Sequence, residues 1–341
     1  MHISCSARKD WQFHIKDWLD YFCNHAKIYS NFQFNYKDID YVFGKTMEST
    51  SHYSPDMEGQ TQLWGGRIDS GINLTILDIY WLYNKGIGIK FPLSNKFVTY
   101  EQYKKSKPFL KQYHRKGNAI ITATDELAKY IKEDFPDYEI EASCIQDIVS
   151  AEKLEQKVSL GLYDTIVLPI HMNDDIKFLE GIKDKEKIRL FLNVECSYLC
   201  PKKVCYGTTS KINIDERNRI TGAPTQMQCS FWNLGMERIF YKDHIDWNNF
   251  YFDKSKFDKI GITKYKLIPP GLEIQQRTVT MYKKNRKLLN LSKESFRQRD
   301  ERKKKEQTES EKMQDELEPT DKETEKFLDD IANNTPNSEQ F

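Results

Sequence analysis

The chain alternates short apolar runs with longer amphipathic stretches over most of its length. The apolar runs are rich in Ile and Val and have the length of buried strands. They cover residues 38–44, 86–91, 118–123, 138–143, 163–168, 188–194 and 264–268. Helical spacing of the apolar positions between them predicts helices over residues 69–84, 101–114, 125–134, 145–156 and 174–182. Strands that alternate with helices in this way form a parallel sheet covered by helices.

The number of strand–helix units decides between two architectures. Eight units in roughly 250 residues close a TIM barrel, and six or seven units are visible in this sequence. We therefore predict an α/β protein built on a (β/α) TIM-like barrel, complete or incomplete. An open doubly wound sheet is the alternative architecture for the same alternation of strands and helices.

The two ends of the chain differ from this alternating region. Apolar residues at helical spacing between residues 8 and 28 predict an amphipathic helix, which makes residues 1–37 an N-terminal helical segment. The barrel domain is then expected over residues 38–291. After Leu291 the sequence is charged and polar, so residues 292–341 are predicted to form a solvated helix followed by a disordered tail. The basic run at residues 302–305 has acidic neighbours on both sides, which favours a solvated helix face over a nucleic-acid contact.

Charge and hydropathy indicate the cellular compartment of the protein and the kinds of partner it lacks. Lys and Arg number 52 against 51 Asp and Glu, so no global attraction to nucleic acid or to a membrane follows. The first residues lack the apolar core of a signal peptide, and polar residues interrupt the most apolar stretch, residues 72–91. We therefore expect a cytoplasmic protein without a membrane partner. In a reducing compartment its seven cysteines are ligands or buried thiols rather than disulfides.

Four of these cysteines fall in one part of the chain. Cys196, Cys200 and Cys205 follow the strand predicted at residues 188–194, and Cys229 lies further on. Cysteines at this spacing on loop-like sequence can converge on one metal, and thiolates are ligands for both zinc and iron–sulfur clusters. The spacing matches no standard zinc ribbon or ferredoxin, so the sequence predicts a metal centre without identifying the metal. Thiols that bind no metal are the alternative.

Polar residues that follow the predicted strands are candidates for a ligand site, because active sites of parallel barrels lie at the C-terminal ends of the strands. Arg67 follows two glycines that allow a close approach of the backbone to a ligand. Ser94 and Asn95 follow the strand at residues 86–91, and Asn193 and Glu195 lie at the end of the strand at residues 188–194. This polar set suits a small polar ligand.

For some strand-end residues a structural role is the alternative to ligand binding. Ser94, Ser143 and Asp175 are of types that cap the next helix with their side chains. His171 lies near Asn173 after the strand at residues 163–168, but it has no second metal ligand at a suitable spacing on either side. The chain carries no Walker motif, no nucleophile elbow and no His-Glu-x-x-His motif.

Several of these features occur in an order that resembles the collagenase-like peptidase family, peptidase family U32. The features, in order, are Trp64-Gly65-Gly66-Arg67, Leu93-Ser94-Asn95, Asn193-x-Glu195-Cys196-x-x-x-Cys200-Pro201 and Gly261-Ile262-Thr263-Lys264-Tyr265-Lys266-Leu267. The resemblance covers roughly residues 38–290, and many members of the family come from bacteria and their mobile elements. It implies a TIM-like barrel, and it adds Lys266 to the candidate ligand-binding residues.

The resemblance also implies a cofactor and a type of reaction. Cys196, Cys200 and Cys229, with Cys205, would hold a [4Fe–4S] cluster, with zinc as the alternative. The activity implied is oxygen-independent hydroxylation of a small molecule or of RNA bases. A non-catalytic barrel whose charged tail recruits a protein partner, and a peptidase, are the other two hypotheses. Where the family would carry Lys-x-Glu-Gly-Arg, this sequence reads Lys266-Leu267-Ile268-Pro269-Pro270-Gly271, so the Glu and the Arg are missing.

Overall fold

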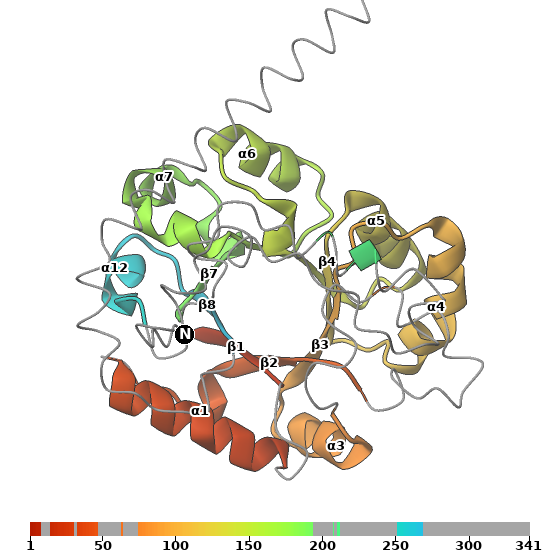
Figure 1. Cartoon of the computed structure of the whole chain (residues 1–341), viewed down its shortest axis with the longest axis horizontal. Helices are drawn as coiled ribbons and strands as arrows, with labels where there is room; N and C mark the ends of the chain where they lie inside the picture. The colour runs from red at the N-terminus through yellow and green to blue at the C-terminus, as the bar shows by residue number, and fades with distance from the viewer. Residues whose placement is uncertain are drawn as a thin grey trace, which may run out of the picture. The chain divides into compact units, whose positions relative to one another are not determined.

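In the computed structural model the chain forms a closed barrel of parallel strands in the order β1 to β8 (Figure 1). The residues described are 1–7, 14–30, 33–46, 63, 74–193, 207, 210–211 and 251–268. The strands are β1 (His2–Ser6), β2 (Ile39–Phe43), β3 (Gly88–Leu93), β4 (Ala119–Thr122), β5 (Glu139–Ala142), β6 (Thr165–Val167), β7 (Ile188–Phe191) and β8 (Lys264–Leu267). Because β1 pairs in parallel with both β2 and β8, the ring closes. The predicted TIM-like barrel is confirmed, and the open sheet is excluded.

The strand β1 corrects the predicted domain organisation. Residues 1–37 contain this first barrel strand and the helix α1 (Ile15–Tyr29), so the boundary expected at residue 37 falls inside the barrel. The pattern was missed because β1 is short and alternates apolar Ile3 and Cys5 with Ser4 and Ser6. Only pairing with two neighbouring strands makes such a sequence a barrel strand. The helix and disorder predicted for residues 292–341 lie outside the described residues.

Helices cover the outside of the barrel (Figure 1). After α1 they are α3 (Ile76–Asn84), α4 (Tyr100–Gln112), α5 (Asp125–Asp134), α6 (Ala151–Ser159), α7 (Ile176–Gly181) and α12 (Lys254–Lys259). Most of them begin at a side chain that accepts a hydrogen bond from the first turn, as Thr124 does from the backbone N–H of Leu127. Within the described ranges, no helix is long and apolar enough to cross a membrane.

Two predicted helices start later than the sequence pattern indicated. The chain after β5 first makes a 3₁₀ turn, Cys144–Gln146, and then places Asp147 in the left-handed region with φ of 57°. That conformation ends the turn, and α6 begins only after its cap, Ser150. A 3₁₀ turn, Ile170–Asp174, likewise precedes α7.

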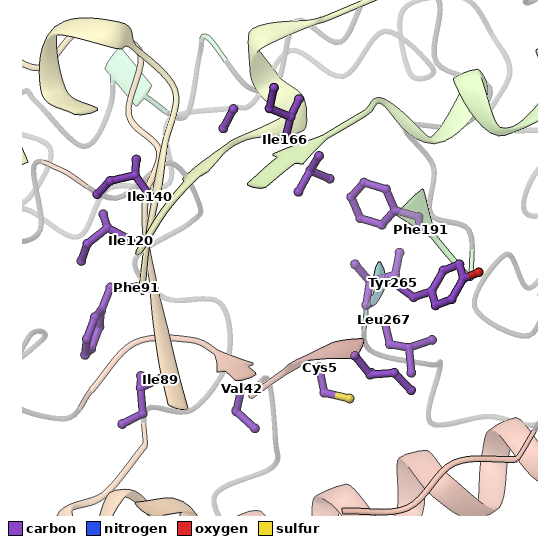
Figure 2. Packing of buried hydrophobic residues seen from close by; sticks show 14 of the residues in the cluster. Cys5, Val42, Ile89, Phe91, Ile120, Ile140, Ile166, Phe191, Tyr265 and Leu267 are labelled. Carbon is purple, nitrogen blue, oxygen red and sulfur yellow. The ribbon is translucent and has the colours of Figure 1, made fainter. Parts of the chain in front are cut away.

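The space between the strands and the helices is filled by apolar side chains. Ile89, Phe91, Ile120 and Ile140 are fully buried, and Figure 2 shows them pointing away from the barrel axis. The ring of Phe91 packs edge-on against Phe109 of α4 at 5.1 Å between ring centroids. Burial of each such side chain stabilises the fold by about 1.5–3 kcal/mol, so this layer holds the helices on the barrel.

Candidate functional site in the barrel and at its C-terminal end

The inner face of the barrel carries buried charged side chains on four of its strands. Four strands carry one charged residue between two buried apolar residues, and these charged residues are Lys90 (β3), Glu141 (β5), Arg189 (β7) and Lys266 (β8). Successive side chains of a strand point to opposite faces. Because the labelled neighbours of Lys90, Glu141 and Lys266 point outward (Figure 2), these three side chains point into the barrel, where Arg189 meets Glu141. All four are buried, and we refer to them as the barrel charge cluster.

Glu141 is the centre of the barrel charge cluster. Its Oε1 accepts a hydrogen bond from Lys266 Nζ at 2.9 Å, and its Oε2 accepts one from Lys90 Nζ at 2.5 Å. The Nε of Arg189 lies 3.4 Å from the same Oε2. The guanidinium also donates from Nη1 to the backbone oxygen of Tyr265 at 2.9 Å, which fixes its orientation. One carboxylate therefore faces three cationic side chains.

Aromatic rings of β2 cover two of the cations. Lys90 Nζ lies 4.2 Å from the centroid of the Tyr41 ring, and Lys266 Nζ lies 4.6 Å from that of Phe43. A desolvated cation over an aromatic face gains about 2 kcal/mol. These contacts offset part of the cost of burying positive charge, but they supply no negative charge.

Burial and the neighbouring charges shift two pKa values in the cluster. Burial lowers the pKa of Lys90 to about 7, and the positive charge of Arg189 acts in the same direction. For Glu141, burial by itself raises the pKa. The three cations around Glu141 outweigh burial and hold its pKa well below its usual range, so it stays ionised.

A second group of contacts joins the loops at the C-terminal end of the barrel. Asn95, just after β3, donates from its backbone N–H to the oxygen of Leu63 at 3.0 Å and from Nδ2 to the oxygen of Ser210 at 2.8 Å. Its Oδ1 accepts a hydrogen bond from the N–H of Phe97. The loop after β2 and the connection after β7 therefore both meet the chain at Asn95.

The connection from β7 to β8 is closed at its base and also reaches the far side of the barrel. Asn193 pairs with Tyr251 in an isolated antiparallel bridge, so the chain returns next to the point where it leaves β7. Asn193 also exchanges two hydrogen bonds with the backbone of Ile268 at 2.8 and 3.0 Å. Since β3 and β7 are four strands apart in a ring of eight, the contact between Ser210 and Asn95 spans the end of the barrel.

The candidate residues predicted from the sequence have different positions and roles in the structure. Lys266 belongs to the barrel charge cluster, whereas Asn95 and Asn193 tie backbone segments together. Ser94 is buried after β3. The remaining candidates lie outside the described residues, namely Arg67, Glu195, Cys196, Cys200, Cys205 and Cys229.

The alternative of helix capping is confirmed at two positions. Ser143 accepts a hydrogen bond from the N–H of Ile145, and Asp175 accepts one from the N–H of Phe178. These two side chains stabilise the turns that follow β5 and β6.

Lys90, Glu141 and Arg189 are not among the residues predicted from the sequence. The signal was present, because each is a single charged residue between apolar residues of a predicted strand. In a strand buried on both faces such a residue must find a partner inside the protein. The sequence does not show which strands face one another across the barrel, so the partners could not be assigned.

No metal site is formed by the part of the chain that the structure describes, where no three His, Cys, Asp or Glu side chains are grouped to hold an ion. Of the described cysteines, Cys5 and Cys23 are free thiols. Burial raises the pKa of Cys23 to about 11, which disfavours the thiolate form that binds metals.

Comparison with known proteins gives a likeness at the level of the fold. The chain is similar to the solved structure of the U32 peptidase Mk0906, with 9% sequence identity and a TM-score of 0.45. The match covers 69% of this chain and 93% of that one. At this identity and TM-score the likeness conveys no family membership, activity, substrate or residue role. No protein-family model and no curated protein matches the sequence.

Proposed function

We propose that this protein is a TIM-barrel enzyme with an iron–sulfur cluster at the C-terminal end of its barrel. Cys196, Cys200, Cys205 and Cys229 would hold a [4Fe–4S] cluster. The substrate is a small molecule or a nucleic acid, and the reaction is an oxygen-independent modification of the hydroxylation type. The reaction type rests on the resemblance of the sequence to the U32 family.

One observation carries this proposal. All four cysteines belong to the connection between Asn193 and Tyr251, and the pairing of these two residues closes that connection at the end of β7. Active sites of parallel barrels lie at this end of the strands. A closed base shortens the distance that the chain must cover to bring Cys229 back toward Cys196.

The contact at Ser210 adds a second constraint on the same connection. Ser210 lies five positions after Cys205 in the sequence and is hydrogen-bonded to Asn95 on the opposite side of the barrel. The neighbouring Lys211 lies over the Phe97 ring at 5.6 Å. The segment with the first three cysteines is thus attached on both sides of the barrel end, which supports a metal centre close to the substrate.

A bound iron–sulfur cluster would supply one-electron transfer. The contribution of the described residues is different. They tie the loops over the barrel end through Asn95 and Asn193, and they provide the cations of the barrel charge cluster beneath it.

Metal and sulfide analysis of anaerobically purified protein tests the proposal. We expect about four irons and about four acid-labile sulfides per chain, with absorption in the visible blue. The variant Cys196→Ala should lose most of this iron and sulfide. The matched control Cys23→Ala should keep them, because Cys23 is a free thiol on helix α1.

Two results would contradict the proposal in different ways. Zinc without sulfide would identify a structural metal and favour the non-catalytic barrel whose charged tail recruits a partner. Protein without iron and without zinc after anaerobic purification would overturn the metal centre altogether.

A further inference from the structure

The barrel charge cluster contains more positive than negative charge. Among the described residues, Lys90, Arg189 and Lys266 contribute three cations, and Glu141 contributes the one carboxylate that contacts them. Their side chains are between 1% and 8% exposed. Buried charges are costly unless they are paired, so below about pH 7, where Lys90 is protonated, this arrangement lacks a compensating anion.

Two buried polar groups point to the same conclusion. Within the described part of the chain, Arg189 Nε and Ser4 Oγ have no hydrogen-bond partner. Ser4 is fully buried, and it pairs in register with Lys266 on the neighbouring strand. Its neighbours on β1 face outward (Cys5 in Figure 2), so strand alternation directs Ser4 into the barrel. Unused donors beside excess cations are the groups that bind an anion.

We propose that Lys90, Arg189 and Lys266, with Ser4, form a binding site for an anionic ligand group, a carboxylate or a phosphate. Access is from the C-terminal end, because Lys266 is the penultimate residue of β8 and the most exposed member of the cluster. The site goes beyond the proposed iron–sulfur enzyme, since it requires neither a metal nor any cysteine.

Glu141 has a positioning role in this site. Its two oxygens hold the ammonium groups of Lys266 and Lys90 in place, and they leave the total charge positive. A ligand anion would complete the pairing of these cations without displacing Glu141.

Anion binding in this site should be linked to proton uptake. Lys90 faces Tyr41 of β2, Glu141 of β5, Arg189 of β7 and Lys266 of β8. The inward residues of β4, Ala119 and Ile121, carry no charge. A bound anion favours the protonated form of Lys90 and so raises its pKa from about 7. Binding therefore takes up a proton near neutral pH and weakens as the pH rises above 7.

The test uses the full-length protein and two simple probes, inorganic phosphate and malonate, with chloride at equal ionic strength as the reference. We expect a saturable rise in Tm at pH 6.5 with at least one probe. The probe that acts distinguishes a phosphate ligand from a carboxylate ligand. If neither probe raises Tm above the chloride reference, the site does not exist.

Two variants locate the effect. Lys266→Met, which keeps the length of the side chain and removes its charge, should weaken probe binding about tenfold or more. Lys264→Met is the matched control. Lys264 lies two residues earlier on β8, and its side chain is only half-buried. Equal binding by Lys266→Met and the wild type would overturn the proposal.

A measurement on the wild type keeps the test valid even if Lys266→Met does not fold. Calorimetric titrations of the active probe at pH 7.5, in two buffers of different ionisation enthalpy, report the protons exchanged on binding. We expect a net uptake of protons per anion bound. Binding without proton uptake would show that the probe does not contact the environment of Lys90. The result does not depend on iron or sulfide, so this proposal can fail while the proposed function stands.

Discussion

The strand β3 is buried on both faces, but its two faces differ in chemistry. On β3, Ile89 and Phe91 point outward and Lys90 points inward, and all three side chains are 0–1% exposed. The outer face packs against helices through apolar contacts that many combinations of side chains could make. The inner face depends on one carboxylate, Glu141, that pairs with cations from three other strands.

Within the same strands, the outer face contributes packing stability and the inner face contributes a specific arrangement of charges. In the outer layer many apolar contacts share the stabilisation, so the loss of one side chain leaves the others in place. The inner layer is a connected set of charges, so the removal of one partner affects every other member. We therefore expect substitutions on the two faces to differ in their cost, in their pH dependence and in their effect on ligand binding.

The largest effect is expected for Glu141→Gln. This variant leaves three buried cations without their carboxylate, and the loss of one partner of a buried ion pair costs about 3–5 kcal/mol. Urea denaturation of the variant and the wild type measures the difference in the free energy of unfolding. Glu139→Gln is the control on the same strand, where the side chain is exposed, and it should cost less than about 1 kcal/mol. Equal costs at the two positions would refute the central role of Glu141.

On the outer face, Ile140→Ala should destabilise the protein by about 3 kcal/mol. Ile140 is fully buried under the helices, and its truncation leaves a cavity in addition to the lost apolar contact. The milder variant Ile140→Val should cost about 1 kcal/mol, because it removes a single methylene group. Anion binding should persist in both variants. Loss of anion binding in the folded Ile140→Val protein would mean that the two faces are not independent.

The pH dependence of stability should come from the inner face. The pKa of Lys90 is about 7 in the folded protein and near its ordinary value of 10.5 in the unfolded chain. The unfolded chain therefore binds more protons between these values, and stability rises with pH by about 1 kcal/mol per unit from pH 7 to 9. The variant Lys90→Met should lose this slope. Unfolding by urea across this pH range checks the result, and the same slope in both proteins would exclude Lys90 as its source.

The smallest effect is expected at the outer edge of the helical layer. Thr124→Ala removes the side chain that accepts the hydrogen bond from the N–H of Leu127 at the start of α5, at a cost of about 1 kcal/mol. Thr124→Ser keeps the hydroxyl and should retain most of the stability. Chemical denaturation of the two variants distinguishes the hydrogen bond from other effects of the substitution.

Local patterns were sufficient for most of the barrel. The helix α5 was predicted at the residues where it occurs, because its apolar positions have helical spacing and Thr124 marks its start. The late strand β8 was also located from its sequence. The strand β1 was missed, since two inward serines interrupt its apolar pattern. Its place in the barrel depends on pairing with β2 and β8.

The candidate site was less accessible to sequence reasoning than the fold. Lys266 was named from the family resemblance, but its partner Glu141 is 125 residues away and Lys90 lies on a third strand. Asn95 and Asn193 were named as ligand-binding residues. The structure shows that both make backbone contacts which join the loops at the barrel end.

The sequence by itself determined the alternation of strands and helices, because burial on one face of a helix or strand leaves a periodic pattern in the chain. It also set the positions of the helix caps and the four cysteines of the β7–β8 connection. Only the tertiary structure decided that the sheet closes and that Lys90, Glu141, Arg189 and Lys266 meet inside it. The physical reason is that the sequence gives the charge of each residue directly. Which residues pair depends on the register of strands that lie far apart in the sequence.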